Sequence, residues 1–199
     1  MTTMFREIPD LMKERMNYLE LIDKEDRING TPKSQRLRQI PPETGKFIAL
    51  MLAVSPDGIA MEIGTSAGYS SMWLALACRE TDRKLITFEI LEEKVKLAHE
   101  TFSKAGLEDI VELVHGDTRY LINQYSGISF CFLDCDKDYY LDCYEAIIPK
   151  MIGGGILIAD NVISHADTLK PFLDYVYNDQ RVDAVLIPLK NGELVCRKK

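Results

Sequence analysis

Two stretches near the start of the chain carry apolar residues at the three- and four-residue spacing of a helix. They cover residues 4–22 and 41–54, and the second opens with two prolines, which a helix tolerates in its first turn. The polar residues 23–39 between them predict a surface connector. We therefore expect residues 1–56 to form N-terminal helices joined by this connector.

From residue 57 onward, short apolar runs alternate with amphipathic segments. The apolar runs predict buried strands, and the amphipathic segments predict helices. The five strands are expected at residues 58–63, 84–90, 110–115, 128–134 and 153–160. The five helices are expected at residues 69–80, 92–105, 117–125, 138–149 and 165–178. This alternation is typical of a mostly parallel sheet that is covered on both faces.

The last two apolar runs, residues 182–188 and 193–198, are separated by a turn that contains Asn191-Gly192. Asn-Gly is a strong signal for an antiparallel hairpin. The whole pattern predicts an α/β fold with a seven-stranded, mostly parallel sheet, a C-terminal antiparallel hairpin and helices on both faces. Because the chain has 199 residues and no internal repeat, we expect one domain over residues 1–199.

Charge and composition narrow the class of protein. No run approaches the roughly 18 apolar residues that cross a bilayer, and the start of the chain is too charged for a secretory signal, so we expect a cytoplasmic protein without a membrane partner. The net charge of -7 argues against a broad, non-specific grip on nucleic acid. The cysteines are odd in number and lie mostly in apolar runs, which predicts reduced thiols in the core. Cys131 and Cys135 have no second Cys or His pair at the spacing of a zinc site. The cysteines are Cys78, Cys131, Cys135, Cys143 and Cys196.

The loop after the first predicted strand of the sheet admits two interpretations. Gly64-Thr65-Ser66-Ala67-Gly68 matches G-x-S-x-G, the turn that presents a nucleophilic serine in hydrolases. A hydrolase also needs a histidine within reach of that serine, and none of His99, His115 and His165 carries a distinctive signal for this role. The same loop can instead bring its backbone close to a cofactor, which is the interpretation that we favour.

The ends of the predicted strands favour a cofactor that carries adenosine, an amino group and a carboxylate. In an open α/β sheet, ligands bind beyond the carboxyl ends of the strands. There, Glu89 can accept both hydroxyls of a ribose, and the helix after Gly68 offers free N–H groups to a carboxylate. Glu62 would repel a pyrophosphate but suits an amino group, so S-adenosylmethionine fits better than NAD.

Two further strand ends carry a set of oxygen ligands. Asp134, Asp160 and Asn161 together suit a hard divalent cation such as magnesium, manganese or calcium. A cation favours the oxyanion of a bound phenol, and Lys137 can accept or offset its proton. Taken singly, Asp160 and Asn161 could be turn residues, and Lys137 could be a solvated lysine at the start of a helix.

Four segments, in this order and spacing, resemble the cation-dependent class I O-methyltransferases, the group that contains caffeoyl-CoA and catechol O-methyltransferases. The resemblance covers about residues 36–198 and implies a Rossmann-like methyltransferase fold with its core at residues 57–199. The segments are MEIGTSAGYSSMWLALA, ITFEI, FLDCDKDYY and GGGILIADNV.

The resemblance also implies the residues of the site, by matched position. It implies that Lys137 is catalytic together with Asp134, and that the cation is bound by Asp134, Asp160 and Asn161. It assigns the ribose to Glu89, the adenine to Asp117 and Thr118, and the methionine end of the cofactor to Ile40 and the Glu62 loop. The implied cofactor residues are Ile40, Glu62, Gly64, Thr65, Ser66, Gly68, Ser70, Glu89, Asp117, Thr118 and Asp134.

The function implied by the resemblance is methyl transfer from S-adenosylmethionine to a hydroxyl of a small, catechol-like aromatic acceptor, in a cation-dependent enzyme that forms a homodimer. The N-terminal helix and connector are a plausible interface element. The segment ISHADTLKP after Asn161 is shorter than in many family members, and it shapes the acceptor pocket, so the acceptor itself cannot be inherited from the family.

Two alternatives keep the cofactor. In the first, the acceptor is a hydroxylated uridine in tRNA, and the basic residues of the connector and the preceding helix contact its phosphates. In the second, the protein binds S-adenosylmethionine without catalysis, although the cation ligands and Lys137 argue against this. The basic residues are Lys13, Arg15, Lys24, Arg27, Lys33, Arg36 and Arg38.

Overall fold

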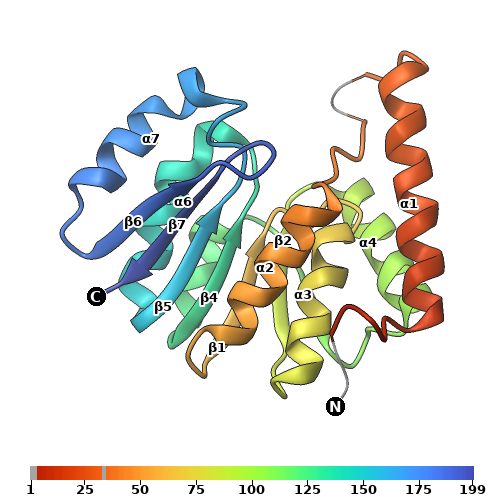
Figure 1. Ribbon diagram of the computed structural model, residues 1–199, viewed down its shortest axis with the longest axis horizontal. Helices are drawn as coiled ribbons and strands as arrows, with labels where there is room; N and C mark the ends of the chain where they lie inside the picture. Colours follow the sequence, from red (N-terminus) through yellow and green to blue (C-terminus); the bar gives the residue numbers. More distant parts are fainter. Residues whose placement is uncertain (1–3, 33–34) are drawn as a thin grey trace.

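The computed structural model describes residues 4–32 and 35–199. It contains one seven-stranded sheet with the order β3-β2-β1-β4-β5-β7-β6, flanked by helices on both faces (Figure 1). Strands β1 to β5 are parallel to one another, and β7 is antiparallel to both β5 and β6, which confirms the predicted topology. The strands are β1 Ile59–Ile63, β2 Leu85–Glu89, β3 Val111–His115, β4 Ile128–Leu133, β5 Met151–Ala159, β6 Val182–Ile187 and β7 Glu193–Lys198.

The helices form two layers around the sheet. On one face lie α2, α3 and α4, and α1 packs on the outside of α3 and α4 (Figure 1). The other face is covered by α5, α6 and α7. The helices are α1 Asp10–Ile28, α2 Pro42–Val54, α3 Tyr69–Glu80, α4 Glu92–Ala105, α5 Thr118–Leu121, α6 Tyr140–Ile147 and α7 Ala166–Asn178.

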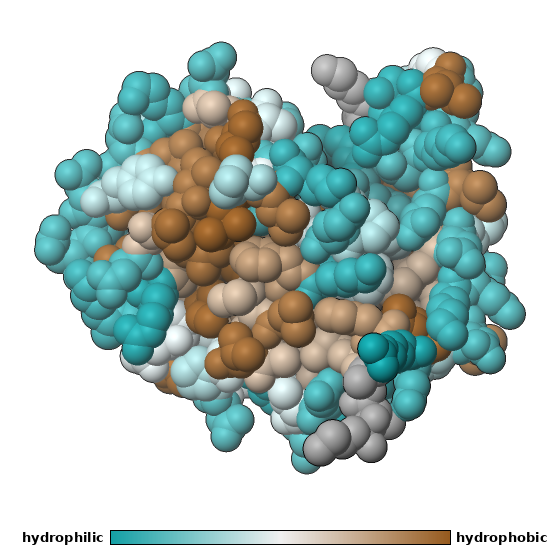
Figure 2. Space-filling model, viewed as in Figure 1, coloured by the Kyte–Doolittle hydropathy of each residue, from teal (hydrophilic) through white to brown (hydrophobic). Residues whose placement is uncertain are grey.

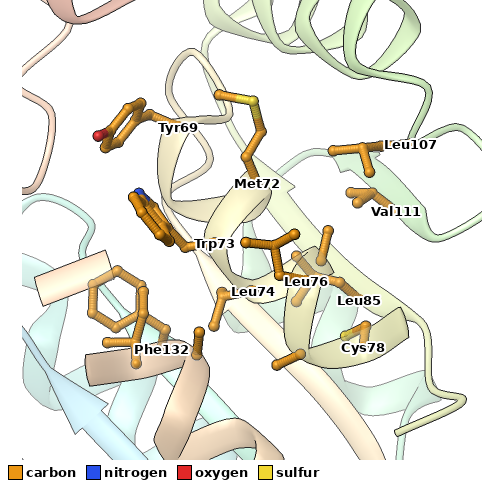
Figure 3. Packing of buried hydrophobic residues seen from close by; sticks show 14 of the residues in the cluster. Tyr69, Met72, Trp73, Leu74, Leu76, Cys78, Leu85, Leu107, Val111 and Phe132 are labelled. Carbon is orange, nitrogen blue, oxygen red and sulfur yellow. The ribbon is translucent and has the colours of Figure 1, made fainter. Parts of the chain in front are cut away.

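Alternation along the central strands divides the core in two. On β4, Phe130 and Phe132 pack into the cluster beneath α2 to α4, whereas Cys131 and Leu133 pack beneath α6 and α7. Because both faces of the strand are covered, it reads as a continuous apolar run in the sequence. Figure 3 shows the first cluster around α3, where Met72, Trp73 and Leu76 are buried.

The predicted N-terminal helix is wrong at both ends. Helix α1 begins at Asp10, after Pro9, and it continues to Ile28 through the first part of the predicted connector. The continuation is polar, but its residues tolerate a helix, and an ion pair of 2.8 Å joins Arg27 to Asp23 one turn earlier. Polarity at residues 23–28 therefore marks a solvated helix rather than a loop.

Smaller differences concern the ends of other helices. The predicted helix at 117–125 is α5 followed by a 3-10 helix, and the predicted helix at 138–149 is α6 between two 3-10 helices. All five cysteines are free thiols; four are buried as predicted, and Cys135 is half-buried. Within residues 4–32 and 35–199, no helix is long and apolar enough to cross a membrane.

Candidate active site

A cavity of about 760 Å³ lies beyond the carboxyl ends of the parallel strands. Its walls come from the residues that follow β1, β2, β3, β4 and β5, and from connector residues 36–40. A cavity of this size is typical of a small-molecule site. Most of the residues predicted from the sequence line it: Ile40, Gly64, Thr65, Ser66, Ser70, Glu89, Asp117, Thr118, Asp134, Lys137, Asp160 and Asn161.

The loop after β1 has a backbone that its glycines make possible. Gly64 has a φ of +100°, and a Cβ there would lie 2.2 Å from the carbonyl oxygen of Asp134. Gly68 has a φ of +82° and precedes the first residue of α3. Ser66 donates from its hydroxyl to the carbonyl of Leu37 at 3.0 Å, so the described contacts give this serine no histidine partner. The loop therefore packs closely on the backbone that follows β4, and its serine lacks the partner that a nucleophile needs.

Glu89, at the end of β2, is held by three backbone N–H groups. Its Oε2 accepts from Ser66 at 2.8 Å, and its Oε1 accepts from Ile90 and Leu91 at 2.9 Å each. The side chain is 8% exposed and borders the cavity. These bonds fix the carboxylate beside the β1 loop and leave lone pairs for a ligand.

Two predicted cofactor residues, Glu62 and Gly68, lie behind the cavity wall. Glu62 is fully buried and accepts hydrogen bonds from Ser71 and from Thr87, the latter at 2.6 Å. Burial raises the pKa of its carboxyl to about 7, and its Oε1 has no partner among the described residues. Ser70, the neighbour of Ser71 on α3, does border the cavity.

Lys137 is held at the bottom of the cavity by three hydrogen bonds. Its Nζ donates to Asp134 Oδ1 at 2.8 Å, to the Tyr140 hydroxyl at 2.9 Å and to the carbonyl of Cys135 at 3.1 Å. The Tyr140 hydroxyl in turn donates to the carbonyl of Asp160 at 3.1 Å. The ends of β4 and β5 are thereby joined through one lysine and one tyrosine.

Asp160 and Asn161 follow β5 on the same side of the cavity. Asp160 is 1% exposed, and burial together with the charge of Asp134 raises its pKa. Its Oδ1 accepts from the N–H of Asn161, which adopts the left-handed conformation that asparagine tolerates, with a φ of 66°. The two acids with the Asn161 amide form an all-oxygen set, and no three acidic, His or Cys side chains form a metal-binding group in the described chain.

The donor set fits a hard cation. Two buried carboxylates repel each other, and a divalent ion between them offsets this repulsion. An amide oxygen and water can complete the coordination of the ion. The sequence analysis missed one acid near this set, Glu193, whose carboxyl is buried against Asp160 and whose pKa is raised by burial and by that neighbour. A lone acid at the start of the apolar run 193–198 was the available signal.

The residues predicted to contact adenine lie beside an ion pair at the edge of the cavity. Asp117 accepts from Arg119 Nε at 3.0 Å and 3.1 Å and caps the start of α5. The Arg119 guanidinium also lies 4.1 Å from the centre of the Tyr139 ring, which borders the cavity. This stack links the predicted adenine residues to the loop that carries Lys137.

The basic residues do not form one face. Arg15 is buried and bonds Thr101, and Lys13 pairs with Asp10 on the outside of α1. Arg27, Arg36 and Arg38 border the cavity, a position that the sequence did not predict. Lys33 lies outside the described residues.

Comparisons with known proteins agree with the fold and identify the family. A family model described as O-methyltransferase matches residues 14–199. Caffeoyl-CoA O-methyltransferase 2 of Populus trichocarpa is 28% identical over 181 residues, which covers 78% of this chain and 73% of the relative. Caffeoyl-CoA O-methyltransferase of Medicago sativa is 25% identical over 181 residues, with the same coverage of 78% and 73%.

Solved structures share the architecture at lower identity. The SAH-bound methyltransferase of Podospora anserina superposes with a TM-score of 0.80 at 21% identity and covers 96% of this chain and 89% of its own. The O-methyltransferase of Bacillus cereus in complex with SAH gives a TM-score of 0.79 at 21% identity, with 94% and 91% covered. The chain therefore belongs to the O-methyltransferase family of S-adenosylmethionine-dependent enzymes.

Proposed function

We propose that the protein transfers a methyl group from S-adenosylmethionine to a hydroxyl of a small, catechol-like aromatic acceptor with the help of a divalent cation. One observation carries this proposal: the residues suited to the cofactor and those suited to the cation border the same cavity. Glu89 would accept the ribose hydroxyls, while Ile40 and Ser70 border the part suited to the methionine chain. The methyl group of the cofactor and the acceptor oxygen would then meet beside Lys137.

The cation would be held by Asp134, Asp160 and Asn161, and magnesium, manganese or calcium suits these oxygens. When bound, it would lower the pKa of an acceptor hydroxyl and neutralise the oxyanion. Vicinal hydroxyls suit such a site because both oxygens can approach one ion.

Lys137 would stabilise the acceptor oxygen by its charge. All three of its N–H groups are engaged, with Asp134, Cys135 and Tyr140. This arrangement orients the ammonium, and one N–H must be released before it can donate to the acceptor. The contacts support an electrostatic role beside the oxyanion more than the role of a free base.

The outer part of the cavity would receive the ring of the acceptor. It is bordered by the aromatic ring of Tyr139 and by polar side chains of the segment after Asn161 and of the hairpin turn. Those polar residues are Ser164, His165, Thr168 and Asn191. A small aromatic compound with polar substituents matches this lining.

The proposal is tested by incubating the protein with methyl-labelled S-adenosylmethionine and a panel of catechols, with and without EDTA. We expect label transfer that EDTA abolishes and magnesium restores. Transfer that is indifferent to chelation would remove the cation from the mechanism, and a panel without any turnover would contradict the acceptor class.

A second acceptor, a hydroxylated uridine in tRNA, is favoured by one observation. Arg27, Arg36 and Arg38 stand at the cavity on the connector side, where a phosphate backbone could reach them. Binding to tRNA should then weaken steeply as salt is raised, and an absence of binding at low salt would end this alternative. The net charge of -7 makes the small molecule our preference.

We also propose that the protein forms a homodimer. Figure 2 shows apolar surface gathered over α2 and the neighbouring C-terminal strands. Leu50 and Val54 on α2 and Val185 on β6 are 51%, 71% and 53% exposed. This patch is a better interface candidate than the connector, and a monomer by light scattering at micromolar concentration would contradict the proposal.

A further inference from the structure

Glu193 is a buried acid to which the site described above gives no task. It is the first residue of β7 and has no exposed surface. One carboxyl oxygen, Oε1, accepts from the Thr44 hydroxyl at 3.2 Å, whereas Oε2 receives no donor from the described residues. Burial of a carboxyl group opposes folding unless its neighbours compensate for the lost water. The position of Glu193 therefore needs a partner that explains it.

The sheet register identifies that partner. Strands β5 and β7 are antiparallel neighbours, and their last pair joins Ala159 to Leu194. One further step in the same register sets Asp160 opposite Glu193, and opposed residues in antiparallel strands project from the same face. The register therefore brings the two buried carboxyl groups side by side, with the unpartnered Oε2 of Glu193 available to Asp160.

The hairpin that carries Glu193 also holds the loop after Asp160 by its backbone. The carbonyl of Gly192 accepts from Val162 at 3.0 Å, and the carbonyl of Asn191 accepts from Ile163 and Ser164 at 2.9 Å each. These bonds hold the segment that follows Asn161, and Glu193 holds the residue that precedes it. The hairpin thus supports both proposed cation ligands at the end of β5.

We propose that Glu193 is a positioning residue that orients the Asp160 carboxylate for the cation. This inference rests on the proposed function, because it assumes that Asp160 binds a cation. Glu193 does not border the cavity, so it acts through Asp160 rather than as a ligand itself. Groups that hydrogen-bond a metal ligand fix its orientation, and their loss weakens metal affinity about 10- to 100-fold.

Two substitutions separate this role from simple packing. In Glu193→Gln the amide oxygen can still accept from Thr44 while the N–H donates to Asp160. In Glu193→Leu the bond to Thr44 and the polar contact with Asp160 disappear, although the volume is roughly retained. Because a leucine avoids the burial of a carboxyl group, the folded protein should be no less stable than the wild type. A merely structural residue would change stability and cation binding together.

The matched control is Asp183→Asn. Asp183 lies on β6 of the same hairpin, its side chain is 66% exposed, and it pairs with Lys199 at 3.2 Å. The change removes the same charge from the same hairpin without touching Asp160. Asp160→Ala serves as the reference for a site that has lost a ligand.

The experiment is calorimetric titration of Mn²⁺ into each full-length variant without acceptor, together with its thermal midpoint. We expect Glu193→Leu to bind Mn²⁺ about 10- to 100-fold more weakly at an unchanged or higher midpoint, and Glu193→Gln and Asp183→Asn to bind like the wild type. If Glu193→Leu fails to fold, Thr44→Val replaces it, because it frees the same carboxyl from its other partner and should also weaken Mn²⁺ binding.

The outcomes distinguish the positioning role of Glu193 from the proposed function. Wild-type affinity for Mn²⁺ in Glu193→Leu, or in Thr44→Val if the leucine variant does not fold, overturns the positioning role. The proposed function stays intact in that case if Asp160→Ala abolishes Mn²⁺ binding. A wild-type protein that binds no Mn²⁺ overturns both. Equal weakening in Asp183→Asn would show that only the charge of the hairpin matters, which also overturns the positioning role.

Discussion

Replacement of Glu89 by alanine tests the proposed ribose site and the loop that adjoins it. The structure gives this carboxylate two tasks, because it accepts from the backbone N–H groups of Ser66, Ile90 and Leu91 before any cofactor is bound. A loss of cofactor affinity in Glu89→Ala could therefore come from a loosened loop or from lost ribose contacts. A ligand that lacks one ribose hydroxyl distinguishes the two.

The magnitudes follow from the bonds. Hydrogen bonds to a charged group contribute about 1.5–3 kcal/mol, so the lost contact to one ribose hydroxyl should weaken S-adenosylmethionine about ten-fold to over a hundred-fold. The loop contribution is common to every ligand. A 2'-deoxy analogue should therefore lose less affinity between wild type and variant, by about 1.5–3 kcal/mol. The unliganded variant should itself be less stable by about 1–3 kcal/mol, because the loop N–H groups lose their acceptor.

The assay is calorimetric titration of both ligands into both proteins, with urea unfolding of the unliganded proteins. The four dissociation constants form a thermodynamic cycle whose coupling energy isolates the contact with the 2'-hydroxyl. Equal losses for the two ligands would refute the assignment of this hydroxyl to Glu89. Unchanged stability of the unliganded variant would refute the supporting role of the three backbone bonds.

Two further predictions concern residues around the β1 loop. Burial raises the pKa of Glu62 to about 7, so its folded form keeps a proton that the unfolded chain releases near 4.5, and stability falls as pH rises between these values. Glu62→Gln should therefore gain up to about 3 kcal/mol over wild type at pH 8 and much less at pH 4.5, and equal gains in urea unfolding would contradict this. Gly64→Ala should lose at least about 1–3 kcal/mol and cofactor affinity, because its Cβ would meet the Asp134 carbonyl. Gly106→Ala, with a φ of +63° and open space, is the control, and an equal loss there would exclude the close approach as the cause.

The strands and helices of the core were predictable from the sequence because each is a local pattern. The run predicted at residues 128–134 corresponds to β4, Ile128–Leu133, whose residues are all buried, and the amphipathic segment 92–105 corresponds to α4 without change. The end of α1 was not predictable from hydrophobicity, since residues 23–28 have no apolar stripe and are helical through local bonds such as Arg27 with Asp23. Polar helices and polar loops share the same composition.

The candidate site was predictable where it depends on one rule of parallel sheets. Glu89 ends β2, Asp134 and Asp160 directly follow β4 and β5, and parallel strands end at the same edge. Glu193 escaped the sequence analysis because its partner, Asp160, lies 33 residues earlier and is brought to it only by the antiparallel register of β7 on β5. The full burial of Glu62 outside the cavity lining likewise depends on side-chain packing that no spacing reveals.

The central claim is that Asp160 serves the chemistry through a cation and not the binding of the cofactor. Its most direct test is the rate of catechol methylation by Asp160→Ala at saturating magnesium, with the dissociation constant of S-adenosylmethionine measured on the same preparation. We expect turnover to be abolished while cofactor affinity stays close to wild type, because Asp160 lies at the end of β5 and does not bond the loop of residues 64–68 or Glu89. Turnover that survives, or an equal loss of both quantities, would contradict the account.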